Sequence, residues 1–298
     1  MARPARTAIA LLLAAPLTGI GVWPGLVDAG AGELPAREPA AGERAVRQPG
    51  SEEPLDRVLD LYVRDGLVYY AALQSDRAGL DRYLAARRAA PAGFDGWSRE
   101  RLIAFWLNSY NAIVLRTVLD RYPIRGDAPE YPANSIRQIP GAFERIAHEV
   151  AGRRVTLDEI EESVLGSFGD PRVFLALGRG AVGSARLRSE AFSAARLELQ
   201  LDAAVEEFAT EPHGVVLDRL GGTVRVNPVF GWREAAFVAA YADRGWAESG
   251  RSSIERAILA LIEPALFPSE RAFLAENSFA LRYQTFDWRL NDLTGGRP

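Results

Sequence analysis

The sequence contains no cysteine and no lysine, and it has only two histidines, His148 and His213. The absence of cysteine excludes disulfides, thiolate zinc sites and a thiol nucleophile. The absence of lysine excludes a Schiff-base amine, a pyridoxal-phosphate anchor and the lysine of a P-loop. Two histidines leave two candidate bases for a serine nucleophile and almost no basis for a metal site built from several histidines. We therefore expect no cofactor and no metal centre.

A surplus of positive charge is also missing, because the formal net charge of the 298 residues is -4. This argues against nucleic acid as a partner, since neutralising its phosphates requires a basic excess. The shares of hydrophobic (48%) and charged (25%) residues are ordinary for a globular protein, and the length is ample for a sizeable core. An alanine- and arginine-rich chain without lysine is typical of a high-G+C bacterial genome.

The N-terminal residues have the pattern of a secretory signal. Arg3 and Arg6 precede an apolar run from Ala8 to Trp23, and the small residues of "VDAGAG" follow it. We predict a signal peptide over residues 1–31, and therefore a periplasmic or secreted protein. An uncleaved anchor is the alternative, but the uninterrupted part of the run is shorter than the roughly 20 residues needed to span a bilayer.

Two segments follow the predicted cleavage point, which lies after Ala29 or Ala31. Residues 32–53 are rich in proline, alanine, glycine and charge, which predicts a disordered linker. Residues 54–298 show helical patterns and short strands that do not alternate regularly with the helices, which favours a single α+β domain. No second hydrophobic run is long enough to span a membrane, so we expect no membrane span in the mature chain.

The strongest expected element is a central buried helix from Ser98 to Tyr122. It is apolar almost all round, Ser98 is a favourable N-cap, and Pro123 ends it. Further helices are predicted over residues 54–65, 77–90, 156–165, 193–208, 232–242 and 252–261, with a short one after Pro268. Hairpins are predicted with turns at Gly152 and at Gly221–Gly222, and extended segments over residues 68–73, 172–177 and 279–292.

A glycine run, "GRGAVG" from Gly178 to Gly183, matches the dinucleotide-binding spacing G-x-G-x-x-G. That motif requires a helix that opens directly at the third glycine, with its N-terminus at the pyrophosphate. Here the next helical pattern begins near Ser193, about ten residues too late, and no βαβ unit follows. We interpret the match as accidental.

Several motifs occur together in one order along the chain. They are "AFWLNSYNAIVLRTVLDRYP", "VTLDEIEESVL", "PRVFLAL", "RSEAFSAARLELQLDAAVEEF", "NPVFGW" and the closing "FDWRLND". In this order the chain resembles the uncharacterised family catalogued as domain of unknown function 547, over roughly Leu55 to Asp292. The family implies no settled activity.

The resemblance also marks positions at which this chain departs from the family. Family members commonly carry histidine where this chain has Glu162 and Phe174. They carry a cysteine-containing loop where it has Gly178 to Ala185, with Arg179 and Ser184 at the two usual cysteine positions. A thiol and imidazoles beside a glutamate would form a plausible catalytic set. Because this chain lacks all of them, the resemblance implies a degenerate thiol-type site and a non-catalytic protein.

Six residues are candidate ligand contacts: Trp106, Asn108, Asn111, Glu161, Arg179 and Ser184. Asn108 and Asn111 share one face of the central helix. Their amides either contact a ligand or, as we favour, tie the helix to neighbouring loops, including residues 178–187, because an unpaired buried amide costs about 1–3 kcal/mol. If Glu161 points inward, Arg179 is its natural charge partner.

Polar residues also gather at the C-terminal end, in Asp287, Asn291 and Asp292 around Trp288. Carboxylate and amide oxygens suit calcium, but their spacing is unlike the known calcium loop. A polar clasp that fixes the end of the chain is the favoured interpretation.

Three functional hypotheses remain open. The favoured ones are a non-catalytic exported domain that binds a small molecule, a peptide or an envelope protein, and a purely structural partner. A binding domain predicts a pocket lined by Trp106, Asn108, Arg179 and Trp232, whereas a structural partner predicts mutually satisfied polar groups. The alternative is a hydrolase or transferase that uses Ser184 or Glu161, which predicts Ser184 about 2.6–3.2 Å from a carboxylate or from His148.

Overall fold

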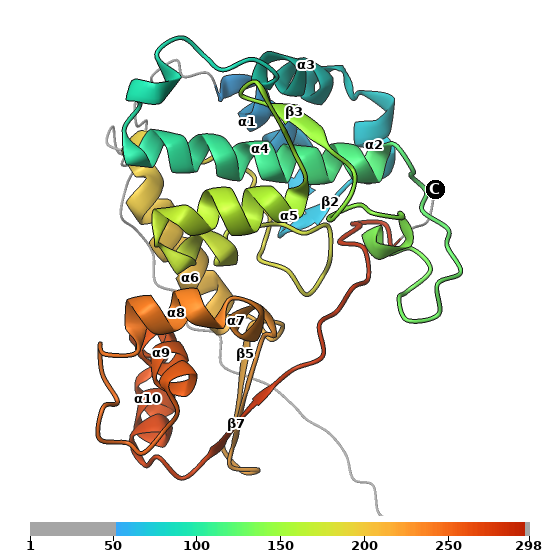
Figure 1. Ribbon diagram of the computed structural model, residues 1–298. Coiled ribbons are helices and arrows are strands. Elements are labelled where there is room, and N and C mark those ends of the chain that lie inside the picture. Colours follow the sequence, from blue (N-terminus) through green and yellow to red (C-terminus); the bar gives the residue numbers. More distant parts are fainter. Residues whose placement is uncertain (1–51, 296–298) are drawn as a thin grey trace, which may run out of the picture. The chain divides into compact units, whose positions relative to one another are not determined.

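The computed structural model describes residues 52–295 (Figure 1). The predicted signal peptide and almost all of the predicted linker lie outside these residues. The chain divides into two units, Met1–Arg47 and Gln48–Pro298, and the architecture below is that of the second. The described part combines many helices with small sheets, which confirms the predicted α+β class.

Helix α4 (Arg99–Leu119) is the central buried helix that the sequence predicts. The Ser98 hydroxyl accepts a hydrogen bond from the backbone N–H of Arg101 at 3.3 Å, which caps its first turn. Every side chain from Ile103 to Leu115 is buried. Among residues 52–295, α4 is also the one helix long and apolar enough to cross a membrane, but most of it is buried inside the protein, as in the core helix of a folded domain.

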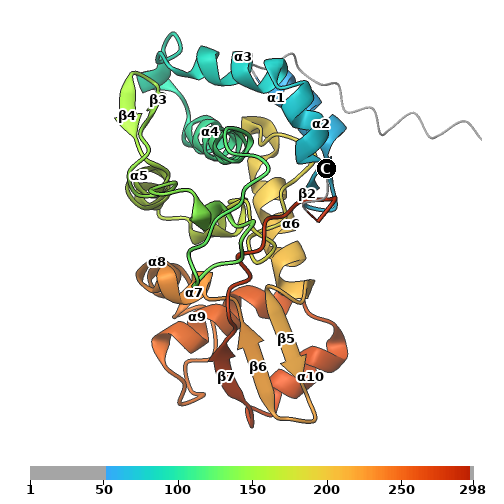
Figure 2. The ribbon, with the colours of Figure 1, turned by 90° about the vertical axis from the view of Figure 1, so that its right-hand side faces the viewer.

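The N-terminal elements pack around one side of α4, which Figure 2 shows nearly end-on. They are α1 (Glu53–Tyr62), α2 (Tyr70–Ser75) and α3 (Ala78–Arg87), with a hairpin of β1 (Val63–Arg64) and β2 (Leu67–Val68). The hairpin turns at Asp65 and Gly66, which both have positive φ, as the Asp-Gly pair of a tight turn requires. The predicted extended segment over 68–73 was therefore wrong beyond Val68. Tyr70 and Leu73, one turn apart, bury one face of helix α2.

A second hairpin follows α4, in agreement with the prediction. Strands β3 (His148–Val150) and β4 (Arg153–Val155) are joined at Ala151 and Gly152. Thr156 and Glu159 then form a reciprocal capping box that starts α5 (Leu157–Glu159), and a π-helical segment, η3 (Ile160–Leu165), continues it. Short 3₁₀ segments connect these elements: η1 (Phe94–Gly96), η2 (Ile136–Gln138) and η4 (Gly166–Phe168).

The predicted strand over 172–177 was wrong, because the chain forms the 3₁₀ helix η5 (Pro171–Leu175) there. Pro171 stands in its first turn, and the Asp170 side chain accepts from the backbone N–H of Arg172 at 3.1 Å. A short apolar run is equally compatible with a buried strand and a buried helical turn. The Asp170 cap and Pro171 favour the helical turn here.

The C-terminal half contains a three-stranded sheet with helices on one face (Figure 2). Strands β5 (Val215–Asp218) and β6 (Thr223–Val226) form the predicted hairpin, and β7 (Ala280–Tyr283) pairs in parallel with β6. The helical segments of this half are η6 (Ala194–Arg196), α6 (Leu197–Thr210), α7 (Val229–Trp232), α8 (Glu234–Tyr241), α9 (Ser253–Ile262), η7 (Glu263–Ala265) and α10 (Pro268–Ala275).

The closing segment, residues 284–292, is not the continuous strand that we predicted over 279–292. Its backbone instead joins the glycine run and strand β2, which lie far apart in the sequence. Val182 and Gly183 donate to the carbonyl oxygens of Arg289 and Asp287 at 2.8 and 2.9 Å, and Val68 donates to that of Asn291 at 2.8 Å. Pairing partners far away in the sequence, which no local pattern reveals, determine this path.

Candidate functional site

Arg179 and Glu161 form a buried ion pair. One nitrogen of the guanidinium, Nη2, lies 2.6 Å from Glu161 Oε1, and Nε donates to Oε2 at 3.2 Å. Both side chains are only 3% exposed. Two parallel N–H···O contacts are the strong, directional form of the arginine–carboxylate interaction. The inward orientation of Glu161, on which the predicted pairing depended, is thus present.

Arg233 completes this group, which we call the Glu161 cluster: Glu161, Arg179, Arg233 and Tyr110. Arg233 Nη2 lies 2.9 Å from Glu161 Oε1, and its Nη1 lies 3.0 Å from the exposed Glu162. The Tyr110 hydroxyl, from α4, donates to Glu161 Oε2 at 3.2 Å. Sequence reasoning missed Arg233, because it follows α7 and is 72 positions away from its partner.

The electrostatics of the Glu161 cluster favour the ionised carboxylate. Burial by itself raises the pKa of Glu161, but the charges and hydrogen bonds of Arg179 and Arg233 outweigh it and hold this pKa below its usual value. Burial and the neighbouring Glu161 hold the pKa of Tyr110 well above its usual value. Glu161 is therefore an ionised acceptor at neutral pH and a poor proton donor.

Three of the four positions that the family resemblance marked as replaced meet at this cluster. Arg179 is part of it, and Glu162 binds Arg233. The backbone carbonyl of Phe174 accepts from Arg179 Nη1 at 3.3 Å, and the guanidinium of Arg233 lies 5.7 Å from the centre of its ring. The fourth position, Ser184, faces elsewhere.

The two amides of α4 tie that helix to neighbouring loops. Asn108 exchanges hydrogen bonds with the backbone of Phe192, at 2.8 Å in each direction. Asn111 accepts from the backbone N–H of Gly178 at 2.9 Å and donates to the carbonyl of Ala176 at 3.3 Å. This is the arrangement that the favoured interpretation predicted.

The residues predicted to line one pocket do not form a common surface. Trp106, Asn108 and Arg179 are at most 3% exposed. Trp232 is 42% exposed and stacks on Trp288, with ring centroids 6.1 Å apart. The ligand-binding role of the six candidate residues, Trp106, Asn108, Asn111, Glu161, Arg179 and Ser184, stays a prediction. The contacts of the first five lie within the protein.

The glycine run forms a buried loop, and no helix opens at its third glycine. Three of its N–H groups already have partners, since Gly178 donates to Asn111, and Val182 and Gly183 donate to the closing segment. A Cβ added at Gly183 would lie 2.6 Å from the backbone nitrogen of Asp287. This glycine therefore permits two backbones to approach closely, and the loop does not have the geometry of a phosphate cradle.

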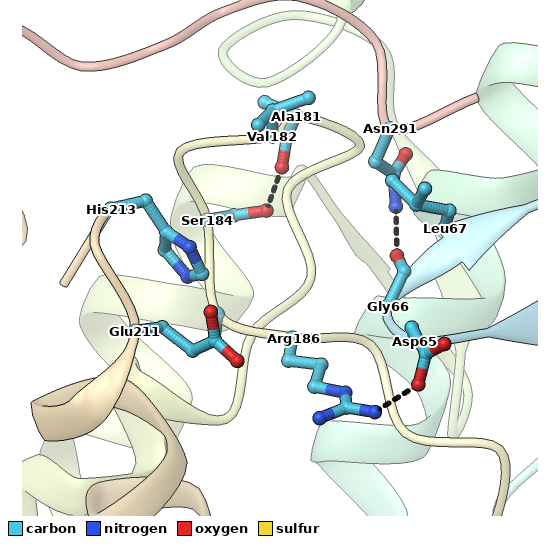
Figure 3. Close-up of a pocket in the computed structure, with 11 residues that line it drawn as sticks. Asp65, Gly66, Leu67, Ala181, Val182, Ser184, Arg186, Glu211, His213 and Asn291 are labelled. Atoms are coloured by element: carbon cyan, nitrogen blue, oxygen red, sulfur yellow. Dashed lines mark hydrogen bonds and ion pairs between the residues drawn. The ribbon is translucent and has the colours of Figure 1, made fainter. Parts of the chain in front are cut away.

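Ser184 lines a surface pocket of about 310 Å³ that lies apart from the Glu161 cluster (Figure 3). Four chain segments contribute to it: the β1–β2 turn, the end of the glycine run with the residues that follow it, the turn after α6, and the closing segment. The lining residues are Asp65, Gly66, Leu67, Ala181, Val182, Ser184, Ala185, Arg186, Glu211, His213 and Asn291. We call this the Arg186 pocket.

The hydroxyl of Ser184 donates to the carbonyl oxygen of Ala181 at 2.5 Å. In Figure 3 it points away from the His213 ring. Within residues 52–295, no hydrogen bond joins it to a carboxylate or an imidazole. The arrangement that the enzyme hypothesis predicted is therefore not present in this conformation.

The Arg186 pocket holds polar groups without partners. His213 Nε2 is buried and has no hydrogen-bond partner, and the Glu211 carboxylate has none in the described part of the chain. Burial lowers the pKa of His213, although Glu211 and Asp287 act in the opposite direction. Arg186 Nη2 lies 2.6 Å from Asp65 at the rim.

The C-terminal polar residues act as the clasp that we favoured. Asn291 accepts from the Tyr70 hydroxyl at 2.8 Å and donates to the carbonyl of Gly66 at 2.9 Å. Asp292 accepts from the Tyr122 hydroxyl at 2.8 Å, and Asp287 pairs with Arg289. Between residues 52 and 295, no three His, Asp or Glu side chains come together in a way that could hold a metal ion.

The sequence contained one unused signal for this pocket. Asp65–Gly66 is an Asp-Gly pair, a strong short-range hairpin signal, and it forms one wall of the pocket. His213 and Glu211 gave no comparable signal, because the pocket exists only where four distant segments meet.

Residues 94–209 match the profile of a family described as "Protein of unknown function, DUF547". The match includes α4, Glu161, Arg179 and Ser184. It does not include Arg233, His213 or the "NPVFGW" and "FDWRLND" motifs. No curated protein and no solved structure matches the chain. Over the segment that carries α4 and the Glu161–Arg179 pair, the chain thus resembles the DUF547 family of proteins of unknown function.

Proposed function

We propose that this chain is an exported, non-catalytic binding domain in which the thiol-type site of its family is closed. The single observation that carries this proposal is the Glu161 cluster. Arg179 stands at a family cysteine position and lies 2.6 Å from Glu161, with both side chains 3% exposed. A group that is buried and saturated with internal contacts has no surface for a substrate.

The chemistry of the cluster supports the same conclusion. A guanidinium stays protonated at all physiological pH values and is therefore neither a nucleophile nor a general base. Glu161 is ionised and surrounded by two arginines, whose contacts hold its pKa low. An efficient general base has a pKa near the working pH, so Glu161 is poorly suited to that role.

The proposed partners are a small molecule, a peptide or an envelope protein, and not nucleic acid. The Arg186 pocket supports the binding part of the proposal, since it is open and has unpartnered polar groups. Export is supported by the basic start, the apolar run from Ala8 to Trp23 and the small residues after it. Sequencing the N-terminus of protein recovered from the periplasm should give a chain that begins after Ala29 or Ala31.

The catalytic part is tested by hydrolysis assays on the mature chain. We expect that p-nitrophenyl acetate and fluorogenic peptides are turned over at the same background rate by the wild type and by Ser184→Ala. A wild-type rate well above that of Ser184→Ala would refute the non-catalytic proposal.

A hydrolase that uses Ser184 is the second candidate, and one observation favours it. Ser184 and His213 line the same pocket, and His213 Nε2 has no partner. The serine hydroxyl would have to leave the Ala181 carbonyl and rotate toward the imidazole. This candidate requires that Ser184→Ala and His213→Gln abolish turnover to the same extent.

A further inference from the structure

We infer that the Arg186 pocket binds a small zwitterion that carries both a primary ammonium and a carboxylate, that is, a free amino acid or a very short peptide. This inference rests on the proposed binding function and names the class of ligand. It follows from the size of the pocket, from the separation of its charges and from the groups that lack partners.

The volume restricts the ligand to a small molecule. About 310 Å³ is the lower end of the range of roughly 300–1,000 Å³ that is usual for ligand pockets. An amino acid or a dipeptide fits such a space, whereas a folded partner or a long chain would make only a marginal contact there.

One side of the pocket suits an ammonium group. Figure 3 shows Glu211 and His213 together at this side. No hydrogen bond or ion pair holds the Glu211 carboxylate among the described residues, and His213 Nε2 is buried without a hydrogen-bond partner. Leaving a buried polar atom unpaired costs about 1–3 kcal/mol, so a ligand that donates hydrogen bonds is favoured at this point. Burial lowers the pKa of His213, which keeps the imidazole neutral and one of its nitrogens able to accept.

The other side suits a carboxylate. The guanidinium of Arg186 reaches this side and uses only Nη2 on Asp65, so its other N–H groups remain available in the described structure. The Arg186 and Asp65 side chains are 36% and 88% exposed, and an exposed pair of this kind is worth little. Arg186 can therefore take a ligand carboxylate in the bidentate manner that guanidinium groups favour.

The β1–β2 turn determines where the Arg186 side chain lies. Gly66 has φ +80°, and a Cβ there would lie 2.8 Å from Arg186 Cγ. The absence of a side chain at Gly66 thus lets the arginine stem lie across the turn. Asn291, bound to the carbonyl of Gly66 and to Tyr70, holds the turn from the closing segment.

Other ligand classes fit less well. No phenylalanine, tyrosine or tryptophan lines the pocket, so a sugar or a nucleobase lacks the large aromatic face on which it usually stacks. A phosphate or a dicarboxylate would meet Arg186 but would be repelled by Glu211 and Asp65. A simple cation would leave the free donors of Arg186 unused. A zwitterion satisfies both sides at once.

The test is calorimetric titration of the mature chain with L-alanine, L-alanyl-L-alanine, N-acetyl-L-alanyl-L-alanine and L-alanyl-L-alanine amide. We expect alanine or the dipeptide to bind, with the comparison between them showing whether a free amino acid or a peptide is preferred. Acetylation and amidation should each weaken binding of the dipeptide by at least about tenfold, because each removes one charge.

Matched variants test which pocket residue binds the ammonium and which binds the carboxylate of the ligand. Glu211→Gln should weaken the dipeptide but have little further effect on the acetylated form, and Arg186→Gln should weaken the dipeptide but have little further effect on the amide. Glu206→Gln removes the same charge from an exposed position on α6 outside the pocket, and it should leave the affinity unchanged.

Three results would overturn the inference: no binding of alanine or the dipeptide, equal binding of the acetylated and amidated forms, or insensitivity to both pocket variants. The proposed non-catalytic function fails on a different readout, namely turnover that depends on Ser184. The two failures are therefore distinguishable.

Discussion

Two arginine–carboxylate pairs of the same length stand at the two ends of one loop. Arg179 lies 2.6 Å from Glu161, and Arg186 lies 2.6 Å from Asp65. The first pair is 3% exposed on both sides, whereas the second is 36% and 88% exposed. The two pairs therefore have the same N···O distance and differ in their exposure to solvent.

This difference separates two roles. In the Glu161 cluster every charge is held by other charges of the protein, and removing Glu161 leaves Arg179 buried without a counter-charge. In the Arg186 pocket water competes with the ion pair, so the arginine is free to change partners. We expect the buried pair to contribute to stability and the exposed one to binding.

The largest expected effect is that of Arg179→Ala. It leaves Glu161 in a dry interior with only Arg233 and Tyr110. Because Arg233 still compensates part of the charge, we expect a loss at the lower end of the roughly 3–5 kcal/mol that breaking a buried pair costs. Urea unfolding of the mature chain would measure the loss in unfolding free energy. The Glu161→Ala variant and the double variant complete the cycle, and we expect strong coupling between the two positions. Strictly additive losses would show that the two side chains do not act as a pair.

The loop that carries both arginines provides the next prediction. In Gly183→Ala the new Cβ would meet the backbone nitrogen of Asp287 at 2.6 Å, and neither backbone can move without breaking the Gly183–Asp287 hydrogen bond. We expect a loss of about 1–3 kcal/mol in the same urea assay, as for other overpacked sites. Gly96→Ala is the control, because a Cβ at Gly96 meets nothing within 4 Å. Equal stability of the two variants would mean that the closing segment does not clamp the loop.

A change of pH should weaken the buried pair by a smaller amount. The pKa of Glu161 lies below its usual value of 4.5 in the folded protein, so as the pH falls below 4.5 the unfolded chain takes up the proton first. Stability from this group is fully present above that pH and is lost as the pH falls through the folded pKa. The unfolding free energy of the wild type should therefore fall more steeply from pH 5 to pH 3 than that of Glu161→Gln. Parallel curves would contradict this assignment.

Local signals allowed much of the fold to be predicted from the sequence. Ser98 and Pro123 delimit α4, glycines close the two predicted hairpins, and Thr156 with Glu159 starts α5. Each of these signals acts within a few residues of the element that it determines. The prediction at 172–177 was wrong because the apolar run there has no helical or strand period, and the cap at Asp170 favours a helical turn.

The site could be predicted only in part. Two arguments suggested the pairing of Arg179 with Glu161. A buried carboxylate needs a charge partner, and the family resemblance marked the position of Arg179. Arg233 joins the same carboxylate from 72 positions away, and the Arg186 pocket needs four segments between Asp65 and Asn291. Such groups depend on how distant elements pack, and no periodicity or spacing in a single sequence encodes that.

The smallest expected effect on stability is that of Arg186→Ala. Its comparison with Arg179→Ala tests most directly whether burial separates the two pairs. The variant removes the same kind of side chain from an equally short pair, but water replaces the lost contact on both sides. We expect a change within about 0.5 kcal/mol in urea unfolding, as for other surface positions. A loss near that of Arg179→Ala would show that the exposed pair is structural, and that Arg186 is not free to take a ligand carboxylate. A small change in stability together with a large loss of dipeptide affinity would establish that burial, and not geometry, divides the two arginines between folding and binding.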